Sequence, residues 1–135
     1  MKRLYSLITK VVPLLLSTWS INSYTQTCYL KISGGFFKQE GCVLVLKNTN
    51  IINDGNVDLQ SGSKMIMKGN QNQVIGGNNV IKFATLEIDK SSGSKVILTQ
   101  DIGIKDTLKF INGYLDIKDK TVDFDTSGIL IGETE

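Results

Sequence analysis

The chain has 135 residues, with 15 Lys and Arg, 13 Asp and Glu, and no histidine. This length gives room for one domain. Without histidine the chain lacks the commonest general base and metal ligand, which argues against most hydrolytic and metal-dependent enzymes. A net charge of +2 is too small to indicate a nucleic-acid-binding protein.

Residues 1–25 have the pattern of a secretory signal peptide. Lys2 and Arg3 supply a positive start, residues 11–16 form an apolar run, and small polar residues lead to Thr25. The run is shorter than the roughly 20 residues of a membrane-spanning helix. We therefore predict a signal helix cleaved after Thr25, or after Ser23, and a mature protein without a membrane segment that is secreted or held outside the outer membrane. The alternatives are an uncleaved anchor and a buried helix.

Cleavage would change the composition of the chain. Residues 1–25 hold three of the 15 basic side chains, none of the 13 acidic ones, and the only proline. The mature part is therefore close to neutral, and the basic character of the whole chain belongs to the leader. The absence of proline from the mature part suits a fold in which nearly every backbone N–H is needed for pairing between strands.

Two cysteines, Cys28 and Cys42, follow the leader. In an oxidising compartment they are a candidate disulfide that would close a loop of about 15 residues and stabilise the fold by roughly 3 kcal/mol. Free thiols are the second interpretation. Lipid attachment at Cys28 is the third, although Thr25 and Thr27 match a lipoprotein signal poorly.

Residues 26–42 and residues 43–135 differ in pattern. The first segment is irregular and interrupted by glycine, which favours a cap. From Val43 onward, pairs of apolar residues spaced two apart recur between Gly, Asn, Asp, Ser and Lys, as expected for short strands joined by bends. These pairs are Val57/Leu59, Leu86/Ile88, Val96/Leu98, Ile102/Ile104, Leu108/Phe110, Leu115/Ile117, Val122/Phe124 and Ile129/Ile131.

The spacing of the later pairs predicts the architecture. They begin at positions 96, 102, 108, 115, 122 and 129, closer together than the usual 8–12 residues between sandwich strands. Three short strands in each coil predict an all-β, right-handed parallel β-solenoid of about four coils over residues 43–135. A β-sandwich is the alternative. Every third pair should then stack: Val96 on Leu115, Ile102 on Val122, and Leu108 on Ile129.

Part of the chain resembles a repeat of large cell-surface proteins of the Bacteroidetes. The resemblance covers residues 80–131 well and residues 43–79 loosely, and it rests on four steps of the repeat. These are Phe83-Ala84-Thr85-Leu86-Glu87-Ile88-Asp89-Lys90-Ser91-Ser92-Gly93, Val96-Ile97-Leu98-Thr99-Gln100-Asp101-Ile102, residues 107–117, and Lys120-Thr121-Val122-Asp123-Phe124. Lys and Asp replace many of the usual Asn and Thr residues.

The resemblance implies an adhesin-like surface protein, of a kind often exported by type IX secretion. Its expected partners are surface glycans, or proteins of a host or neighbouring cell. The family's sorting domain does not follow the repeats, and the chain stops at residues 131–135 directly after an apolar pair. Because a solenoid needs capped ends, we expect an N-terminal fragment whose downstream repeats continue the stack.

Residues that could carry chemistry are few. No catalytic residue, cofactor site or metal site is predicted, and the serines beside glycine fit bends. An acidic run, Asp116, Asp119, Asp123 and Asp125, is interleaved with Lys118 and Lys120, which favours a solvated face over a calcium site. A fragment of a β-helical polysaccharide lyase stays open, because such enzymes use carboxylates and lysines on one face.

Two kinds of surface residue complete the expectations. Tyr29, Phe36, Phe37 and Tyr114 could support carbohydrate binding, although one of the two phenylalanines is expected to pack against the first coil. Thr107, within Asp106-Thr107-Leu108, fits a short O-glycosylation sequence of the Bacteroidetes. We expect a non-catalytic, exported structural or adhesive module; a carbohydrate-binding module is an alternative.

Overall fold

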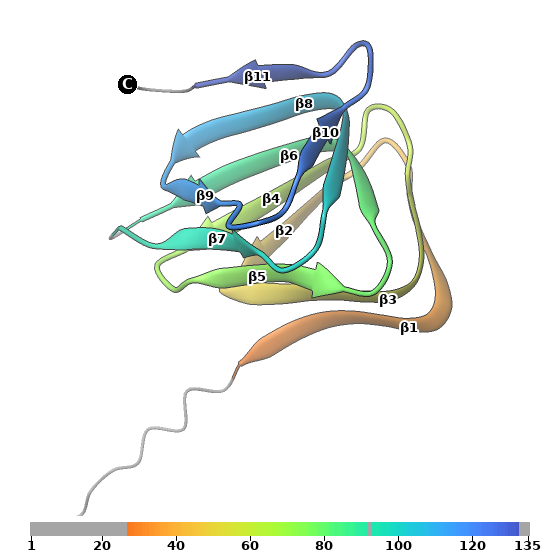
Figure 1. Ribbon diagram of the computed structural model, residues 1–135, viewed down its shortest axis with the longest axis horizontal. Helices are drawn as coiled ribbons and strands as arrows, with labels where there is room; N and C mark the ends of the chain where they lie inside the picture. The colour runs from red at the N-terminus through yellow and green to blue at the C-terminus, as the bar shows by residue number, and fades with distance from the viewer. Residues whose placement is uncertain (1–26, 92, 133–135) are drawn as a thin grey trace, which may run out of the picture.

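The computed structural model describes residues 27–91 and 93–132, and these residues form a parallel β-solenoid of about five coils (Figure 1). The all-β solenoid predicted from the apolar pairs is therefore confirmed, with five coils in place of about four. The signal peptide predicted for residues 1–25 lies outside the described residues. Eleven strands are present: β1 Cys28–Gln39, β2 Val43–Lys47, β3 Thr49–Leu59, β4 Lys64–Gly69, β5 Gln73–Gly77, β6 Ile81–Lys90, β7 Lys95–Leu98, β8 Ile102–Asn112, β9 Tyr114–Asp116, β10 Val122–Phe124 and β11 Ile129–Ile131.

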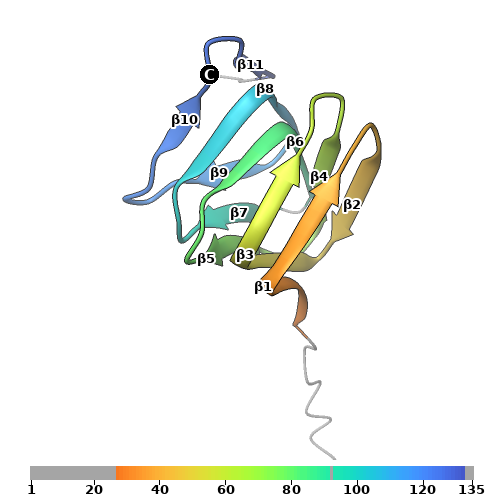
Figure 2. The same ribbon diagram turned by 90° about the vertical axis from the view of Figure 1, so that its right-hand side faces the viewer.

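The strands stack in parallel on three faces, and each coil passes along the faces in the same order. Face 1 is the sheet β1-β3-β5-β7-β9, and the second sheet runs β10-β8-β6-β4-β2, with β11 also paired to β8. The long strands bend and so contribute to two faces; β8, for example, pairs with β10 through Ile102 and with β11 through Leu108. We call the face of β10 face 2 and the face of β2, β4 and β11 face 3. Figure 2 shows the coils side by side.

The solenoid begins earlier than the apolar pairs predicted. Residues 26–42 were expected to form a cap, yet Cys28 pairs with Thr49 and the ladder continues to Gln39 opposite Leu59, with one irregularity between Ser33 and Phe36. This segment is the first two faces of coil 1. Gly34 and Gly35 lie at the corner where β1 bends, and Gly41 lies in the connection between β1 and β2.

The interior is a set of apolar columns that run through the coils. One column passes from Leu44 through Met65, Leu86 and Leu108 to Leu130. Side chains alternate inward and outward along each strand, so spacing by two keeps the apolar residues inside. The inward residues of all the coils form one apolar cluster, in which each coil packs against the coils above and below it.

Two of the three predicted stacks are confirmed. Val96 lies on Leu115, and Ile102 lies on Val122. The third was wrong by one residue, because Leu108 lies on Leu130 and Ile129 lies on Thr107. The corner before β11 holds one more residue than the regular spacing allowed, and this shifts the register of the last strand.

Candidate functional site

At the corner between face 3 of one coil and face 1 of the next, three of the coils place a residue with a positive φ. Asn48, Gly69 and Gly113 lie at this corner of coils 1, 2 and 4 with φ of 51°, 115° and 89°. Residues with a side chain rarely adopt this left-handed conformation, which costs roughly 1–2 kcal/mol, and glycine or asparagine is the usual choice.

A shallow groove follows this corner across the coils. It consists of two depressions that meet at Ser91, one toward the N-terminal coils and one toward the C-terminal coils. We call it the corner groove. Its lining residues are Lys47, Lys68, Gly69, Asn70, Asp89, Ser91, Lys90, Gly93, Asn112, Gly113 and Tyr114.

Asparagine side chains fix the lower part of the corner groove. The amide of Asn48 donates to Oδ1 of Asn70 at 3.1 Å, and its own Oδ1 accepts from the backbone N–H of Gln71 at 3.1 Å. Gly69 lies so close to Asn48 that a Cβ on Gly69 would be 2.1 Å from Oδ1. The backbone N–H of Lys95 donates to Oδ1 of Asn72 at 3.0 Å. These bonds hold the loops of adjacent coils in one arrangement.

Two charged side chains on the wall of the groove, Lys68 and Asp89, are paired between coils. Nζ of Lys68 lies 2.5 Å from Oδ2 of Asp89. The hydrogen bond from Lys68 holds the pKa of Asp89 below its usual range, and the same hydrogen bond raises the pKa of Lys68. At neutral pH both groups are therefore charged and form an ion pair, beside Lys47, which lines the same depression.

The inner wall of the groove contains a buried lysine. Lys90 is 1% exposed, and its Nζ donates to Oε1 of Gln73 at 2.6 Å. Burial lowers the pKa of this lysine. Gln73 is buried as well, and its amide donates to the carbonyl oxygens of Leu46 at 2.9 Å and Thr49 at 2.6 Å. These two side chains link three coils inside the solenoid, and Lys90 does not project into the groove as a free cation.

Tyr114 stands at the C-terminal end of the corner groove. It is 66% exposed and follows Gly113, whose positive φ turns the chain from β8 into β9. An exposed aromatic ring can pack on the apolar face of a sugar, while nearby amide and hydroxyl groups bond to its hydroxyls. Asn112 and Ser91 line the same depression. The groove can therefore hold a polar ligand, and none of its side chains forms a nucleophile–base pair.

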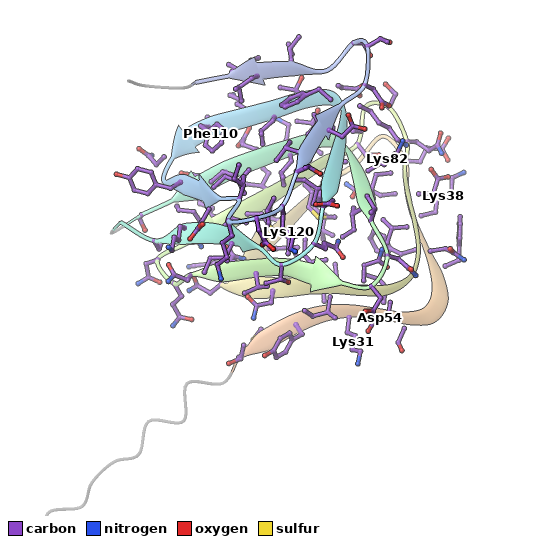
Figure 3. All side chains as sticks on the ribbon, viewed as in Figure 1. Lys31, Lys38, Asp54, Lys82, Phe110 and Lys120 are labelled. Carbon is purple, nitrogen blue, oxygen red and sulfur yellow. The ribbon has the colours of Figure 1, made fainter. Side chains whose placement is uncertain are left out.

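The acidic run does not gather into a cation site. Asp116 pairs with Lys95 at 2.6 Å and Asp119 with Lys120 at 3.0 Å, while Asp125 lies 4.0 Å from Lys82. Lys82 projects outward from the coils, as Figure 3 shows. Within residues 27–91 and 93–132, no group of three or more Cys, Asp or Glu side chains could hold a metal ion.

The two cysteines lie in different parts of coil 1. Both are exposed and free, Cys28 at the start of β1 on face 1 and Cys42 just before β2 on face 3. Cys42 lies at the start of β2, which is five residues long, whereas Cys28 lies below the corner that follows the end of β2. A strand of that length spans about 17 Å, well beyond the Cα separation that a disulfide bridges. The candidate disulfide is not formed in the structure.

The other predicted surface residues have definite places. Thr107 is half-buried on face 3, between Thr85 and Ile129 in neighbouring coils. Its glycosylation stays a prediction. Phe37 packs against the core, whereas Phe36 is exposed. The expectation that one of these two phenylalanines packs against the first coil is confirmed.

The chain has no match among the proteins and structures with which it was compared. No protein-family model, curated protein or solved structure matches it. In the part of the chain that the structure describes, no helix is long and apolar enough to cross a membrane. The corner groove must therefore be interpreted from its own chemistry.

Sequence reasoning missed the corner groove, because its residues come from four separate loops. One signal for it was present in the sequence. Asn48 and Gly69 are 21 residues apart and Gly113 follows 44 residues after Gly69, which is about one and two coil lengths, so a search for Asn or Gly at multiples of the coil length finds the corner. No sequence pattern indicated that Lys90 is buried, because it lies beyond the last apolar residue of its strand.

Proposed function

We propose that the chain is an exported, non-catalytic β-solenoid module of the cell surface, with a structural or adhesive role. The leader pattern of residues 1–25 supports export. The resemblance of residues 80–131 to repeats of Bacteroidetes surface proteins supports the surface location. The fold supports a structural role, since a stack of parallel coils is a stiff unit that presents long flat faces.

One observation carries the non-catalytic part of this proposal: several outward carboxylates, among them Glu87, Asp89 and Asp116, pair with lysines of neighbouring coils. Oε2 of Glu87 lies 3.4 Å from Nζ of Lys64 and 3.7 Å from Nζ of Lys109, so it bridges three coils. Asp89 and Asp116 each pair with a lysine of the coil below. Carboxylates held in this way join the coils and are poorly placed to act as a general acid or base.

Export can be tested apart from adhesion. Residues 1–25 are fused to a phosphatase that is active only outside the cytoplasm and expressed in a Gram-negative host. We expect phosphatase activity from this fusion and none from a matched fusion carrying Leu15→Arg, because a charge in the apolar run blocks signal-peptide function. Equal activity from both fusions, or none from either, would contradict export by this segment.

Adhesion and lyase activity can be separated with one preparation. Residues 26–135 on beads should be retained by bacterial or host cell surfaces, while acidic polysaccharides incubated with the same beads should yield no unsaturated products by ultraviolet absorbance. Product formation that increases with protein and disappears in Lys109→Ala or Glu87→Gln would favour the lyase alternative. Beads carrying heat-unfolded protein are the control for nonspecific retention.

Carbohydrate binding is a second candidate, favoured by Tyr114 beside the corner groove. Isotope-labelled protein titrated with neutral and acidic oligosaccharides should show NMR shifts at Asn112, Gly113 and Tyr114, and Tyr114→Ala should weaken binding. Tyr29, also exposed but on the first coil, provides the matched control in Tyr29→Ala. Shifts that leave the groove unaffected, or equal losses in both variants, would contradict this site.

A further inference from the structure

The two ends of the solenoid expose strand edges. Among the residues that the structure describes, β2 pairs only with β4 at the N-terminal end, and β11 pairs only with β8 at the C-terminal end. Figure 2 shows these strands at opposite ends of the stack. An unpaired edge with apolar side chains is a template for pairing with another strand, and proteins normally protect it with charge, proline or a covering segment.

Face 3 has exposed apolar residues mainly at these two ends. In one outward column Val43 is followed by Lys64, Thr85 and Thr107 and then by Ile129. Val43 is 59% exposed and Ile129 is 52% exposed, whereas the three residues between them are polar.

A second outward column repeats the pattern. It passes from Val45 through Ile66, Glu87 and Lys109 to Ile131. Val45 is 50% exposed and Ile131 is 43% exposed, while Ile66 is half-buried. In both columns a β-branched apolar residue ends the stack at each edge, so the two edges match each other in side-chain type.

The backbone groups at the two edges also match. Lys64 N–H donates to the carbonyl of Cys42, and Asn48 N–H donates to the carbonyl of Lys68. The backbone N–H and C=O groups of the even-numbered residues of β2 thus point toward coil 2. In a parallel strand the backbone groups of alternate residues point to opposite sides, so the N–H and C=O of Val45 point toward the open edge. By the same alternation, those of Leu130 face the open edge of β11. The two edges can pair in parallel with Leu130 opposite Leu44.

The charges of the two terminal coils are opposite. Residues 28–47 contain three lysines and one glutamate, a net charge of +2, and residues 114–132 contain four aspartates and two lysines, a net charge of −2. Lys31 and Lys38 of the first coil project outward (Figure 3). Opposite charges on surfaces that meet speed association and select the partner, whereas two identical ends would repel each other.

From these observations we propose that the two ends of the solenoid form a head-to-tail interface with second copies of this chain. In that interface β11 of one copy pairs in parallel with β2 of the next, which places Ile129 beside Val43 and Ile131 beside Val45. The side chain of Leu130 is then buried between two coils, as that of Leu86 is. A head-to-tail contact of this kind has no closing partner, so it produces an open stack of copies. The proposal goes beyond the proposed function and depends neither on export nor on a ligand in the groove.

The test uses proline at the two edges. Every described strand lies between Cys28 and Ile131, so residues 26–135 contain the whole solenoid that the structure describes. We expect wild-type protein to show a mass that rises with concentration in sedimentation velocity. Val45→Pro and Leu130→Pro each remove an N–H that faces an open edge and should leave the protein monomeric, while Val45→Thr keeps the N–H and the branched side chain and should assemble like wild type.

A mixture of the two proline variants provides the decisive measurement. Val45→Pro retains an intact β11 edge and Leu130→Pro an intact β2 edge, so an equal mixture should form dimers and nothing larger. The circular dichroism spectrum of each variant must match that of wild type. If Val45→Pro does not fold, the double variant Val43→Lys with Val45→Lys replaces it, and if Leu130→Pro does not fold, Leu130→Asp replaces it. The replacement variants are expected to give the same results. Wild type that stays monomeric at all concentrations, single edge variants that still assemble, or a mixture that stays monomeric would overturn the proposal.

Discussion

The central and terminal coils carry the same apolar pattern, yet they differ in burial. Leu86 and Leu130 belong to one interior column, but Leu86 is fully buried and Leu130 is 40% exposed. Both residues are leucines whose side chains point toward the interior. What differs is the number of neighbouring coils among the residues that the structure describes, since Leu86 has one on each side and Leu130 has one. In a solenoid, then, the stabilising effect of an apolar residue depends on its distance from the ends of the stack.

The interior column provides the largest test of this comparison. Leu86→Ala should lower the free energy of unfolding by about 2–5 kcal/mol, because the cavity lies between two packed coils. Leu108→Ala should cost nearly as much, and Leu130→Ala about 1 kcal/mol or less, since its side chain is already partly in water. Urea unfolding of residues 26–135 measures all three. Equal losses at Leu86 and Leu130 would mean that the last coil is covered in solution.

A pair of glycines sharpens the comparison at the corner between faces 1 and 2. Gly77 has φ of 122°, and a Cβ there would lie 2.2 Å from the carbonyl oxygen of Asn53 in the coil below. Gly34 has φ of 64° at the same corner of coil 1, and a Cβ there would meet nothing within 4 Å. Gly77→Ala should cost about 2 kcal/mol or more and Gly34→Ala about 1 kcal/mol.

Thermal unfolding measures both glycine variants. The two substitutions share the strain of a left-handed backbone, and only Gly77→Ala adds a clash with a neighbouring coil. The difference between them is therefore the contribution of the neighbour. If Gly34→Ala proved as harmful as Gly77→Ala, a further segment would have to pack beneath coil 1.

The smallest effect at neutral pH is expected from a pair of lysines, one inside and one outside. Burial lowers the pKa of Lys90 below its ordinary value of 10.5. Between the lowered folded pKa and 10.5 the unfolded chain binds a proton that the folded chain lacks, so the free energy of unfolding rises with pH, by at most about 1.4 kcal/mol per pH unit. Lys90→Met should remove this rise, as measured by urea unfolding at several pH values.

Lys68 is the matched control, because its shift has the opposite sign. Its hydrogen bond to Asp89 raises its pKa, so the stability that this pair contributes is fully present below pH 10.5 and is lost as the pH rises through the raised folded pKa. Lys68→Met should therefore reduce the fall of the free energy of unfolding with increasing pH, whereas Lys90→Met should reduce its rise. A change of the same sign in both variants would contradict the burial of Lys90.

The sequence predicted the second half of the solenoid better than the first, and the corners explain why. From Val96 the coils are short and regular, and Val96 pairs with Leu115 in the next coil. Earlier in the chain, the step from Ile51 to its partner Ile75 is longer, because loop residues such as Asn72 are inserted at a corner. Extra residues at a corner do not disturb the stack, but they interrupt the regular spacing from which coils are recognised.

The candidate site was much less predictable than the fold. Tyr114 was singled out from the sequence as an aromatic residue beside a bend, but Asn48, Asn70 and Ser91 are ordinary loop residues until three coils place them along one groove. The pairing of Lys68 with Asp89 likewise depends on the register between two coils, which sequence spacing gives only approximately.

The sequence by itself favoured a β-solenoid over a β-sandwich, because its apolar pairs recur at shorter intervals than the strands of a sandwich do. It also determined most of the inward residues, since facing follows from alternation along a strand. Only the tertiary structure decided where the stack begins, how the last strand is registered, and which polar residues meet at the corner. Those features depend on contacts between residues a whole coil apart in the chain, and one extra residue at a corner is enough to change them.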